Sequence, residues 1–448
     1  MNTAIIAAVA VAQASTWTNT LRPGIQYIHF VDSDTPLVYH ALKFKYPTSG
    51  IKLEARLAGD EVFGKDGADS LETVGSIAAR TGALAAINGD YFGNDGDPLG
   101  FMMAGGEIVS EPYVPRSAAA WGSGGVLIDS PRWSGALVLT DGAEIAVDGV
   151  DRSARAGEII LNTAKAGVAS SKMPCYAFVF DLVLPLAPGK ASPVKLRHIF
   201  PETTNLNVGE NQMVVLAAPG REKELMGKVW VDLVYDFRMG LSGGIDWKAM
   251  TDSVGGGPRI IKDGQPYVTY QYERFDTSYT KRHPRTAIGT TAAGEVVLCV
   301  VEGRSPFSRG VTLDELATLM LGLGCRDAMN LDGGGSTTMV VEGAAVNRLS
   351  DGFMRKVGNA VLLYAPPVIE PRQISISVKP GEIHVGDKTT LSVVDEAGAS
   401  VSDVMWIGAA TPGWVDGDGV FTAVKPGHMK VQAAASGATA SVELVVLP

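Results

Sequence analysis

Short alternating runs of hydrophobic and polar residues dominate this chain of 448 residues. The run Ile374–Val378 alternates residue by residue, which is typical of a strand with one buried face. The run Val296–Val301 is apolar throughout, as in a strand that is buried on both faces. The 53 glycines separate many such runs and supply turns. The pattern predicts a β-rich α+β fold with few helices.

Only two segments before residue 365 repeat with helical spacing, and each leads directly into a strand. The second begins at Thr312, where Glu315 completes a capping box, and it ends at Gly322 or two residues later. The first begins near Asp69 and ends at Gly82.

The two helix–strand units resemble each other. Residues 70–90 and 312–332 align without a gap, so that one strand ends in Asn88–Asp90 and the other in Asn330–Asp332. The two-residue period of a strand places the Asn and the Asp of each unit on one face. If the strands are neighbours, two carboxylates meet; an internal repeat and a chance similarity both remain open.

The domain boundaries follow changes in pattern. A proline-rich linker at 366–371 separates a main domain, 15–365, from a C-terminal region, 372–448. Within the main domain, residues 141–240 carry their own β pattern and are predicted to form an inserted β subdomain.

The C-terminal region has the strand spacing of a small β-sandwich. Val378–Gly381 and Val424–Gly427 resemble bacterial Ig-like repeats, which implies an Ig-like sandwich of the kind found on cell-surface proteins. We expect Trp406 and Trp414 to pack in its core rather than to form a sugar platform.

The N-terminus favours export. Residues 1–14 contain a short apolar run that ends in Ala12-Gln13-Ala14, which is typical of a signal peptide cleaved before Ser15. No positive charge precedes the run, since the first arginine is Arg22, and the alternative is a buried N-terminal strand or helix. The expected location is secreted or in the cell envelope, with no membrane span.

Charge and cysteine content exclude several classes of function. The 38 basic and 48 acidic residues give a net charge of −10 with no basic cluster, so nucleic acid is not an expected partner. The three cysteines, Cys175, Cys299 and Cys325, lack the paired spacing of a zinc site. A Cys175–Cys325 disulfide remains open.

The densest chemistry follows an apolar strand near residue 330. Asp332 comes directly before a run of small residues, Gly333, Gly334, Gly335, Ser336 and Thr337. Glycines allow main-chain N–H groups to approach a ligand closely, which favours a binding loop over a plain tight turn. Two further segments carry polar groups at strand ends, with His283 and Arg285 before one strand and Glu302 and Arg304 after the next.

Taken together, these segments resemble the phosphodiester glycosidase family over most of residues 80–365. The resemblance rests on Asn88–Phe92, Gly255–Pro258, His283–Ala287, Gly303–Ser305 and Asn330–Ser336. Two positions depart from the family pattern, since Asp90 stands where a small uncharged residue is common and Glu302 where Asp is expected.

The resemblance implies a hydrolase that cleaves the C1–O bond of a sugar-1-phosphodiester, such as one of N-acetylglucosamine, and releases a phosphate monoester. Asp332 is the first candidate for the carboxylate at the anomeric carbon, while Glu302 and Asp90 compete for a second catalytic role. The candidate substrate-binding residues are Arg285, Arg304, His283, Asn88, Asn330, Gly333, Gly334, Gly335, Ser336 and Thr337. The reaction requires no cofactor, and a structural calcium ion remains open.

Three alternatives stay open from sequence. In the first, the chain is a non-catalytic protein that binds wall or surface glycans. In the second, it is a metal-dependent phosphodiesterase that cuts the P–O bond, with Asp90, Asp332 and Glu302 as metal ligands. In the third, Arg285 or Arg304 merely neutralises Asp332 in a structural ion pair.

Overall fold

The computed structural model describes residues 14–64, 70–368, 373–379, 381–410, 412–435 and 437–448. Strands make up 52% of it and helices 9%, which confirms the β-rich α+β prediction. The predicted signal peptide and the predicted helix start at Asp69 lie outside the described residues.

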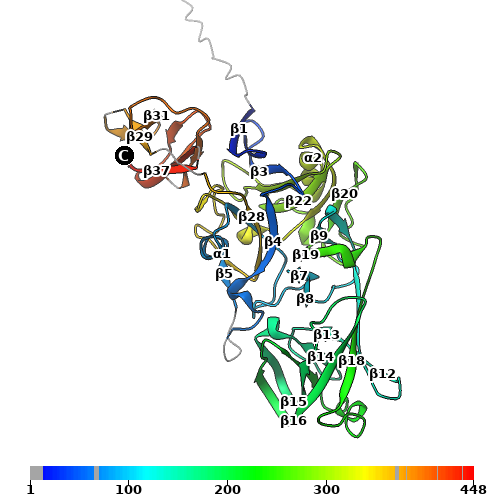
Figure 1. Ribbon diagram of the computed structural model, residues 1–448. Helices are drawn as coiled ribbons and strands as arrows, with labels where there is room; N and C mark the ends of the chain where they lie inside the picture. The colour runs from blue at the N-terminus through cyan, green and yellow to red at the C-terminus, as the bar shows by residue number, and fades with distance from the viewer. Residues whose placement is uncertain (1–13, 65–69, 369–372, 380, 411, 436) are drawn as a thin grey trace, which may run out of the picture.

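Two antiparallel sheets form the central body (Figure 1). The first sheet has the order β1-β2-β3-β23-β22-β24-β20-β21, formed by Ser15–Arg22, Ile25–Asp32, Leu37–Lys45, Glu295–Val301, Arg285–Thr291, Cys325–Asn330, Arg259–Lys262 and Gln265–Pro266. The second has the order β26-β25-β6-β28-β4, formed by Ala344–Ala345, Met339–Val341, Ala85–Asn88, Asn359–Tyr364 and Lys52–Leu57. Leu298 and Met329 of the first sheet share one buried cluster with Ile87 and Leu363 of the second, so one core joins both sheets.

A third sheet, of five strands, extends this core. Its order is β10-β9-β19-β7-β8, formed by Gly125–Asp129, Ala118–Gly122, Met250–Gly255, Met102–Ala104 and Glu107–Ser110. Ala119, Trp121 and Val254 of this sheet belong to the central buried cluster, while Phe101 and Ile108 face the inserted subdomain.

Of the two helices, the second is capped as the sequence predicts, whereas the first ends where predicted but begins later. Helix α2, Leu313–Gly322, begins after Thr312, and both hydrogen bonds of the capping box are present. Helix α1, Val74–Thr81, is capped by Thr73 and ends at Gly82, whose φ of +72° suits glycine. It starts later than predicted because β5, Glu72–Thr73, pairs with β27, Lys356–Val357, and is therefore extended.

The similar helix–strand units end up in different sheets, since β6 belongs to the second sheet and β24 to the first. The two strands are therefore not ladder partners. Their C-terminal ends nevertheless meet, because the Asp332 N–H donates to the Gly89 carbonyl at 3.0 Å.

The inserted subdomain is one eight-stranded sheet. Its order is β12-β11-β18-β16-β15-β17-β14-β13, formed by Glu144–Val147, Arg132–Val138, Val234–Ser242, Ala191–Asn207, Val168–Leu182, Gln212–Ala217, Ile159–Asn162 and Gly149–Val150. The sheet extends beyond the predicted 141–240 at both ends because β11 and β18 pair along their length as the chain enters and leaves.

The C-terminal region consists of two sheets around a common core. One has the order β29-β31-β35-β34-β33, formed by Ile374–Val378, Lys388–Asp395, Val420–Ala423, Gly413–Val415 and Ala409–Ala410. The other has the order β30-β37-β36-β32, formed by Ile383–His384, Ala438–Leu447, Gly427–Ala435 and Met405–Ile407. Trp406 packs in this core, as predicted, whereas Trp414 is only partly buried. The Ig-like assignment of this sandwich stays a prediction.

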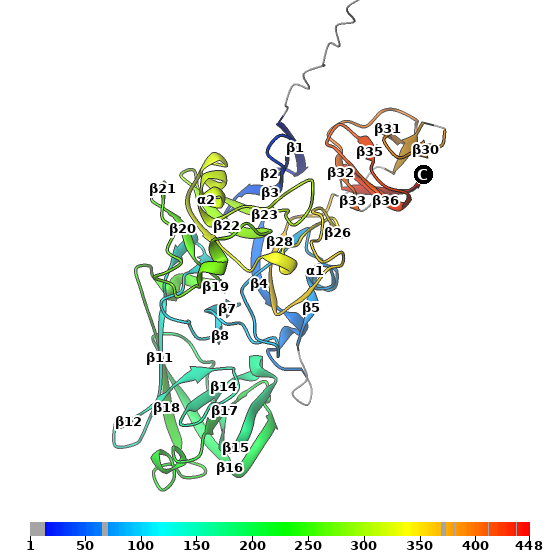
Figure 2. The same cartoon turned by 180° about the vertical axis from the view of Figure 1, so that it is seen from behind.

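The views from both sides show the inserted subdomain and the C-terminal sandwich at opposite ends of the central body (Figure 2). The ends of β6 and β24 lie in the central body between them. Residues from widely separated parts of the chain meet there.

Candidate functional site

A cleft of about 290 Å³ opens where these strands end. Its lining residues come from the loops after β6 and β24, from the 276–285 segment and from the loop after β23. They are Tyr91, Asp276, Ser278, Tyr279, His283, Arg285, Arg304, Asp332, Gly333 and Gly334. The structure thus brings the Asp-Gly-Gly loop together with both predicted arginines and the predicted histidine.

Asp332 is the inner carboxylate of the cleft. Its Oδ1 accepts a hydrogen bond from the Gly333 N–H at 2.8 Å. Burial raises the pKa of Asp332 to about 6, against the lowering effects of the Ser336 hydroxyl and the Gly333 N–H. Asp332 forms no ion pair with any described residue, so a structural role as the counter-ion of Arg285 or Arg304 is not what the structure shows. At neutral pH this carboxylate is ionised and open to the cleft.

Asp90 lies behind the cleft and does not line it. It is 2% exposed, and its Oδ2 accepts from the Gly100 N–H at 2.7 Å while its Oδ1 accepts from the Tyr91 N–H at 2.7 Å. Burial, with a smaller contribution from the nearby charge of Asp332, raises the pKa of Asp90 to about 7. A Cβ on Gly255 would lie 2.3 Å from Oδ2, so this carboxyl is enclosed by backbone. Asp90 therefore binds the backbone N–H groups of Tyr91 and Gly100 behind the cleft and does not face a ligand in it.

The three cationic or imidazole groups differ in how firmly they are held. Arg285 is buried, and its Nε and Nη2 donate to the carbonyls of Val311, Tyr279 and Lys281, which leaves Nη1 without a described partner. Arg304 is 43% exposed, and its only described ion pair, with Asp351, is long at 3.9 Å. Arg304 Nη2 lies 3.4 Å from His283 Nδ1.

His283 is neutral in this setting. Burial and the charges of Arg285 and Arg304 lower the pKa of His283. Its ring therefore offers one donor and one acceptor beside two guanidinium groups. This arrangement is suited to a singly charged anion.

Two of the three glycine amides are already bound within the protein. The Gly333 N–H is bound to Asp332, and the Gly334 N–H donates to the Pro284 carbonyl at 2.9 Å. The prediction that Gly333 and Gly334 bind substrate through their amides therefore does not match the structure. Gly334 has a φ of +63°, and a Cβ there would lie 2.9 Å from Arg304 Nη2, so glycine keeps this wall of the cleft open.

The other members of the loop turn inward. Gly335, Ser336 and Thr337 are buried and are absent from the lining of the cleft. The Thr337 hydroxyl has no hydrogen-bond partner among the described residues. Direct contact of these three with a ligand in the cleft, as predicted, is not what this arrangement shows.

Both predicted substrate-binding asparagines are structural. Asn88 is fully buried, and its Nδ2 donates to the Asp332 carbonyl at 2.7 Å while its Oδ1 accepts from the Thr286 hydroxyl and the Thr338 N–H. Asn330 is also fully buried, and its Nδ2 donates to the Tyr91 hydroxyl at 2.9 Å. The prediction that they bind substrate is corrected, because both side-chain amides are buried and bonded to groups inside the protein.

Glu302 is separated from the other candidates. It lines a second cavity, where its Oε1 accepts from the Arg348 N–H at 2.7 Å and lies 3.2 Å from His40 Nε2. The reason is local: β23 ends at Val301, so the following residues no longer alternate as in a strand, and Glu302 and Arg304 line different cavities. Glu302 does not supply a second carboxylate to Asp332.

Aromatic residues of the cleft were missed by sequence reasoning. Tyr91 and Tyr279 line it, with ring centroids 5.7 Å apart, and Phe275 packs against both. The Arg116 guanidinium lies 4.2 Å from the Phe275 ring centroid. The position of Tyr91 beside Asp90 was a usable signal, whereas Tyr279 lies in a segment with no recognisable pattern.

The structure bears on metals, membranes and disulfides as well. Within the described ranges, no three His, Cys, Asp or Glu side chains gather as a metal site would require, and Asp90, Asp332 and Glu302 do not converge.

No helix of the described part of the chain is long and apolar enough to cross a membrane. Cys175, Cys299 and Cys325 are all free and buried, so the Cys175–Cys325 disulfide does not form.

Comparisons with known proteins point to one family. Residues 234–364 match the family described as phosphodiester glycosidase. An SPbeta prophage-derived uncharacterized protein of Bacillus subtilis is 32% identical over 157 residues, which are 33% of this chain and 24% of that protein. The N-acetylglucosamine-1-phosphodiester alpha-N-acetylglucosaminidase of Bos taurus is 36% identical over 124 residues, 24% of this chain and 23% of that protein. The matched part is thus about a quarter of each relative.

Solved structures share the fold. A Synechocystis hypothetical protein aligns with a TM-score of 0.65 at 19% identity, over 79% of this chain and 64% of that one. A Burkholderia pseudomallei protein described as a candidate exported protein aligns with a TM-score of 0.66 at 18% identity, over 79% of this chain and 97% of that one.

Proposed function

We propose that this chain, which contains a phosphodiester glycosidase domain, hydrolyses the C1–O bond of a sugar-1-phosphodiester. The observation that carries the proposal is an Asp332 carboxylate without an ion-pair partner among the described residues, in a cleft whose other walls hold Arg285, Arg304 and His283. A carboxylate and guanidinium groups in one cleft suit a substrate that becomes positive at carbon while a phosphate leaves.

The phosphate binds at the cationic wall. Arg304 reaches the cleft with a partly exposed guanidinium that lies 3.4 Å from the His283 ring, and Arg285 lines the same cleft. These donors neutralise the diester and then the additional charge that appears on the departing oxygen. Because a phosphate monoester is a good leaving group when its charge is held, the reaction does not depend on a strong acid.

Asp332 acts at the anomeric carbon. The C1–O bond breaks and its electron pair goes to the phosphate oxygen. In one route, C1 gains a bond to water, whose proton Asp332 accepts; in the other, C1 first bonds to Asp332, which water then replaces. In both cases the products are the free sugar and a phosphate monoester. Tyr91 and Tyr279 line the cleft and give the sugar an aromatic surface beside the carboxylate.

The test is hydrolysis of the methyl phosphodiester of N-acetylglucosamine-1-phosphate in H₂¹⁸O. We expect free sugar and methyl phosphate, with no heavy oxygen in the methyl phosphate by mass spectrometry. Heavy oxygen in the phosphate, or inactivation by a chelator, would support P–O cleavage instead. Absence of turnover together with saturable sugar binding would support the non-catalytic alternative.

We also propose that the protein works outside the cytoplasm, in the cell envelope or secreted. The support is the apolar N-terminal run with an Ala-x-Ala end. Cell fractionation with an antibody against the main domain tests this location.

A further inference from the structure

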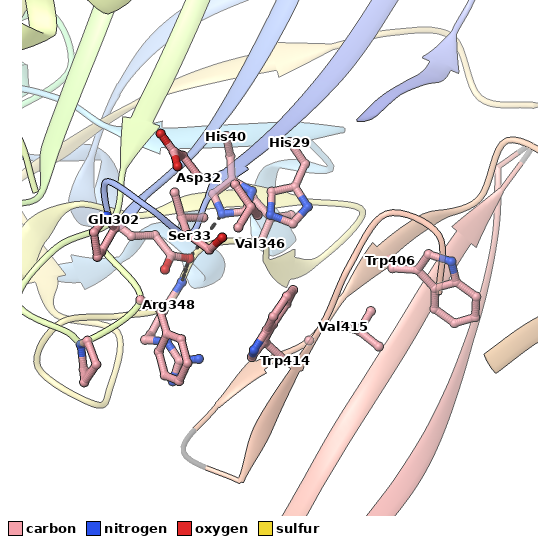
Figure 3. Close-up of a pocket in the computed structure, with 16 residues that line it drawn as sticks. His29, Asp32, Ser33, His40, Glu302, Val346, Arg348, Trp406, Trp414 and Val415 are labelled. Carbon is pink, nitrogen blue, oxygen red and sulfur yellow. Dashed lines mark hydrogen bonds and ion pairs between the residues drawn. The ribbon is translucent and has the colours of Figure 1, made fainter. Parts of the chain in front are cut away.

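A second cavity of about 170 Å³ lies where the C-terminal sandwich meets the central body (Figure 3). Figure 3 shows His29, His40 and Glu302 of the central body on one side of it and Trp414 and Val415 of the sandwich on the other. A water needs only about 10–15 Å³ on such a measure, so the cavity has room for about a dozen non-hydrogen atoms. That is the size of one hexose.

Glu302 presents a free carboxylate oxygen in this cavity. The side chain is 4% exposed, and its Oε1 is bound to the Arg348 N–H and faces His40, whose Nδ1 lies 2.7 Å from the Tyr27 hydroxyl. Its Oε2 accepts no hydrogen bond from any described residue and is not among the fully enclosed polar atoms, so it remains accessible in the cavity. A ligand that displaces water from this oxygen must supply a donor in its place.

His29 is a second polar group of the same wall. It is 8% exposed and stacks on His40 with ring centroids 4.6 Å apart, and its ring nitrogens are not among the fully enclosed polar atoms of the described residues, so they remain accessible to a ligand. Burial and the neighbouring His40 lower the pKa of His29 well below its ordinary value. The neutral ring therefore offers one donor and one acceptor.

The opposite wall is aromatic. Trp414 is partly buried and lines the cavity, and Phe307 lines it with the Arg348 guanidinium 4.8 Å from its ring centroid. An aromatic face beside a carboxylate and a neutral imidazole is suited to a ligand with an apolar face and hydroxyl groups at its edge.

We propose that this interdomain cavity is a carbohydrate-binding site that takes one pyranose unit, with Trp414 against the ring face and Glu302 and His29 on its hydroxyls. An apolar ligand would leave Glu302 and His29 unsatisfied, and a phosphate would be repelled by Glu302. A sugar meets both requirements, since each hydroxyl donates and accepts.

This site is distinct from the hydrolytic cleft. Glu302 and Phe307 face the interdomain cavity, whereas Arg304, in the same loop, faces the cleft. Sugar binding at the second site therefore does not depend on Asp332, and the proposal stands whether or not the cleft is hydrolytic.

The test measures dissociation constants of glucose and N-acetylglucosamine for the full chain by NMR titration. We expect Trp414→Ala to weaken binding at least tenfold and Glu302→Gln to weaken it by about tenfold, the range of one hydrogen bond to a charged group. The matched control is Trp230→Ala, a 60% exposed tryptophan of the inserted subdomain that should leave binding unchanged. Glu302→Gln keeps the Oε1 contact with Arg348, so it remains informative if Trp414→Ala unfolds.

The proposal is overturned if neither sugar binds the wild type saturably. It is also overturned if folded Trp414→Ala and Glu302→Gln variants bind as well as the wild type. Thermal unfolding of each variant checks that loss of binding is not loss of fold.

Discussion

Protonation of Asp332 should set the acid limb of the pH–rate profile. Because burial raises the pKa of Asp332 to about 6, its ionised fraction is about 0.9 at pH 7 and about 0.1 at pH 5. If ionised Asp332 is the nucleophile or base, kcat/KM falls about tenfold between these values. An aspartate with an ordinary pKa near 3.9 would lose only about a tenth of its activity over the same range.

The assay is the initial rate of sugar release from the methyl phosphodiester between pH 4 and pH 8 at constant ionic strength. The substrate keeps its single charge throughout this range, so a change in rate reports on the protein. An acid limb with a midpoint near pH 4, or none, would refute the assignment of Asp332 or the effect of its burial.

Asp332→Asn is the matched variant. An asparagine Oδ1 still accepts from the Gly333 N–H, so the loop keeps its shape, while the rate should fall at least about 100-fold and lose its acid limb. The folded-state pKa of Asp332 is above its unfolded value, so stability is lost as pH rises through about 4 to 6. The variant should therefore unfold at an equal or higher temperature than the wild type at pH 7.

Three further changes test other parts of the structure. Arg304→Ala should raise KM about tenfold, and Arg304→Lys should raise it less, because the Arg304 side chain is 43% exposed at the cleft and weakly paired. Steady-state kinetics measures this, and an unchanged KM would contradict phosphate binding by Arg304. Asp151→Asn should stabilise the protein by about 1–3 kcal/mol more at pH 7 than at pH 5. The reason is that burial raises the pKa of Asp151 to about 8, so the stability of the wild type falls as pH rises from about 4 to 8. Equal shifts in the thermal unfolding temperature at both pH values would contradict this. Gly255→Ala should destabilise the protein by about 1–3 kcal/mol, because a Cβ would lie 2.3 Å from Asp90 Oδ2 and 2.8 Å from Gly100 Cα. Chemical denaturation measures this, and an unchanged denaturation midpoint would show that the Asp90 carboxyl is not enclosed as described.

Local signals in the sequence predicted local structure well. The capping box of α2 and the glycine that ends α1, Gly82, act within a few residues, so spacing alone identifies them. Asp332 was found in the same way, because a strand end followed by glycines is a local pattern. Its place in the cleft together with Arg285, Arg304 and His283 is what the structure adds.

The direction in which a side chain faces was not predictable from the sequence. Glu302 and Arg304 are two residues apart, yet they face different cavities because β23 ends at Val301, so the alternation of a strand no longer sets their direction. Asn88 and Asn330 have the composition of ligand-binding residues, but their hydrogen-bond partners come from distant segments. Such partners depend on how the two sheets pack, and no spacing rule contains that information.

The hydrogen bonds of Asn88 connect cleft formation to the order of folding. Asn88 binds Asp332, Thr286 and Thr338, which lie 244, 198 and 250 residues further along the chain. Contacts this distant in sequence form only after long loops have closed, so the cleft is completed when the two central sheets dock and not before. Recovery of hydrolytic activity during refolding should therefore lag behind the recovery of strand content, and catalysis would serve as a reporter of the last step of folding.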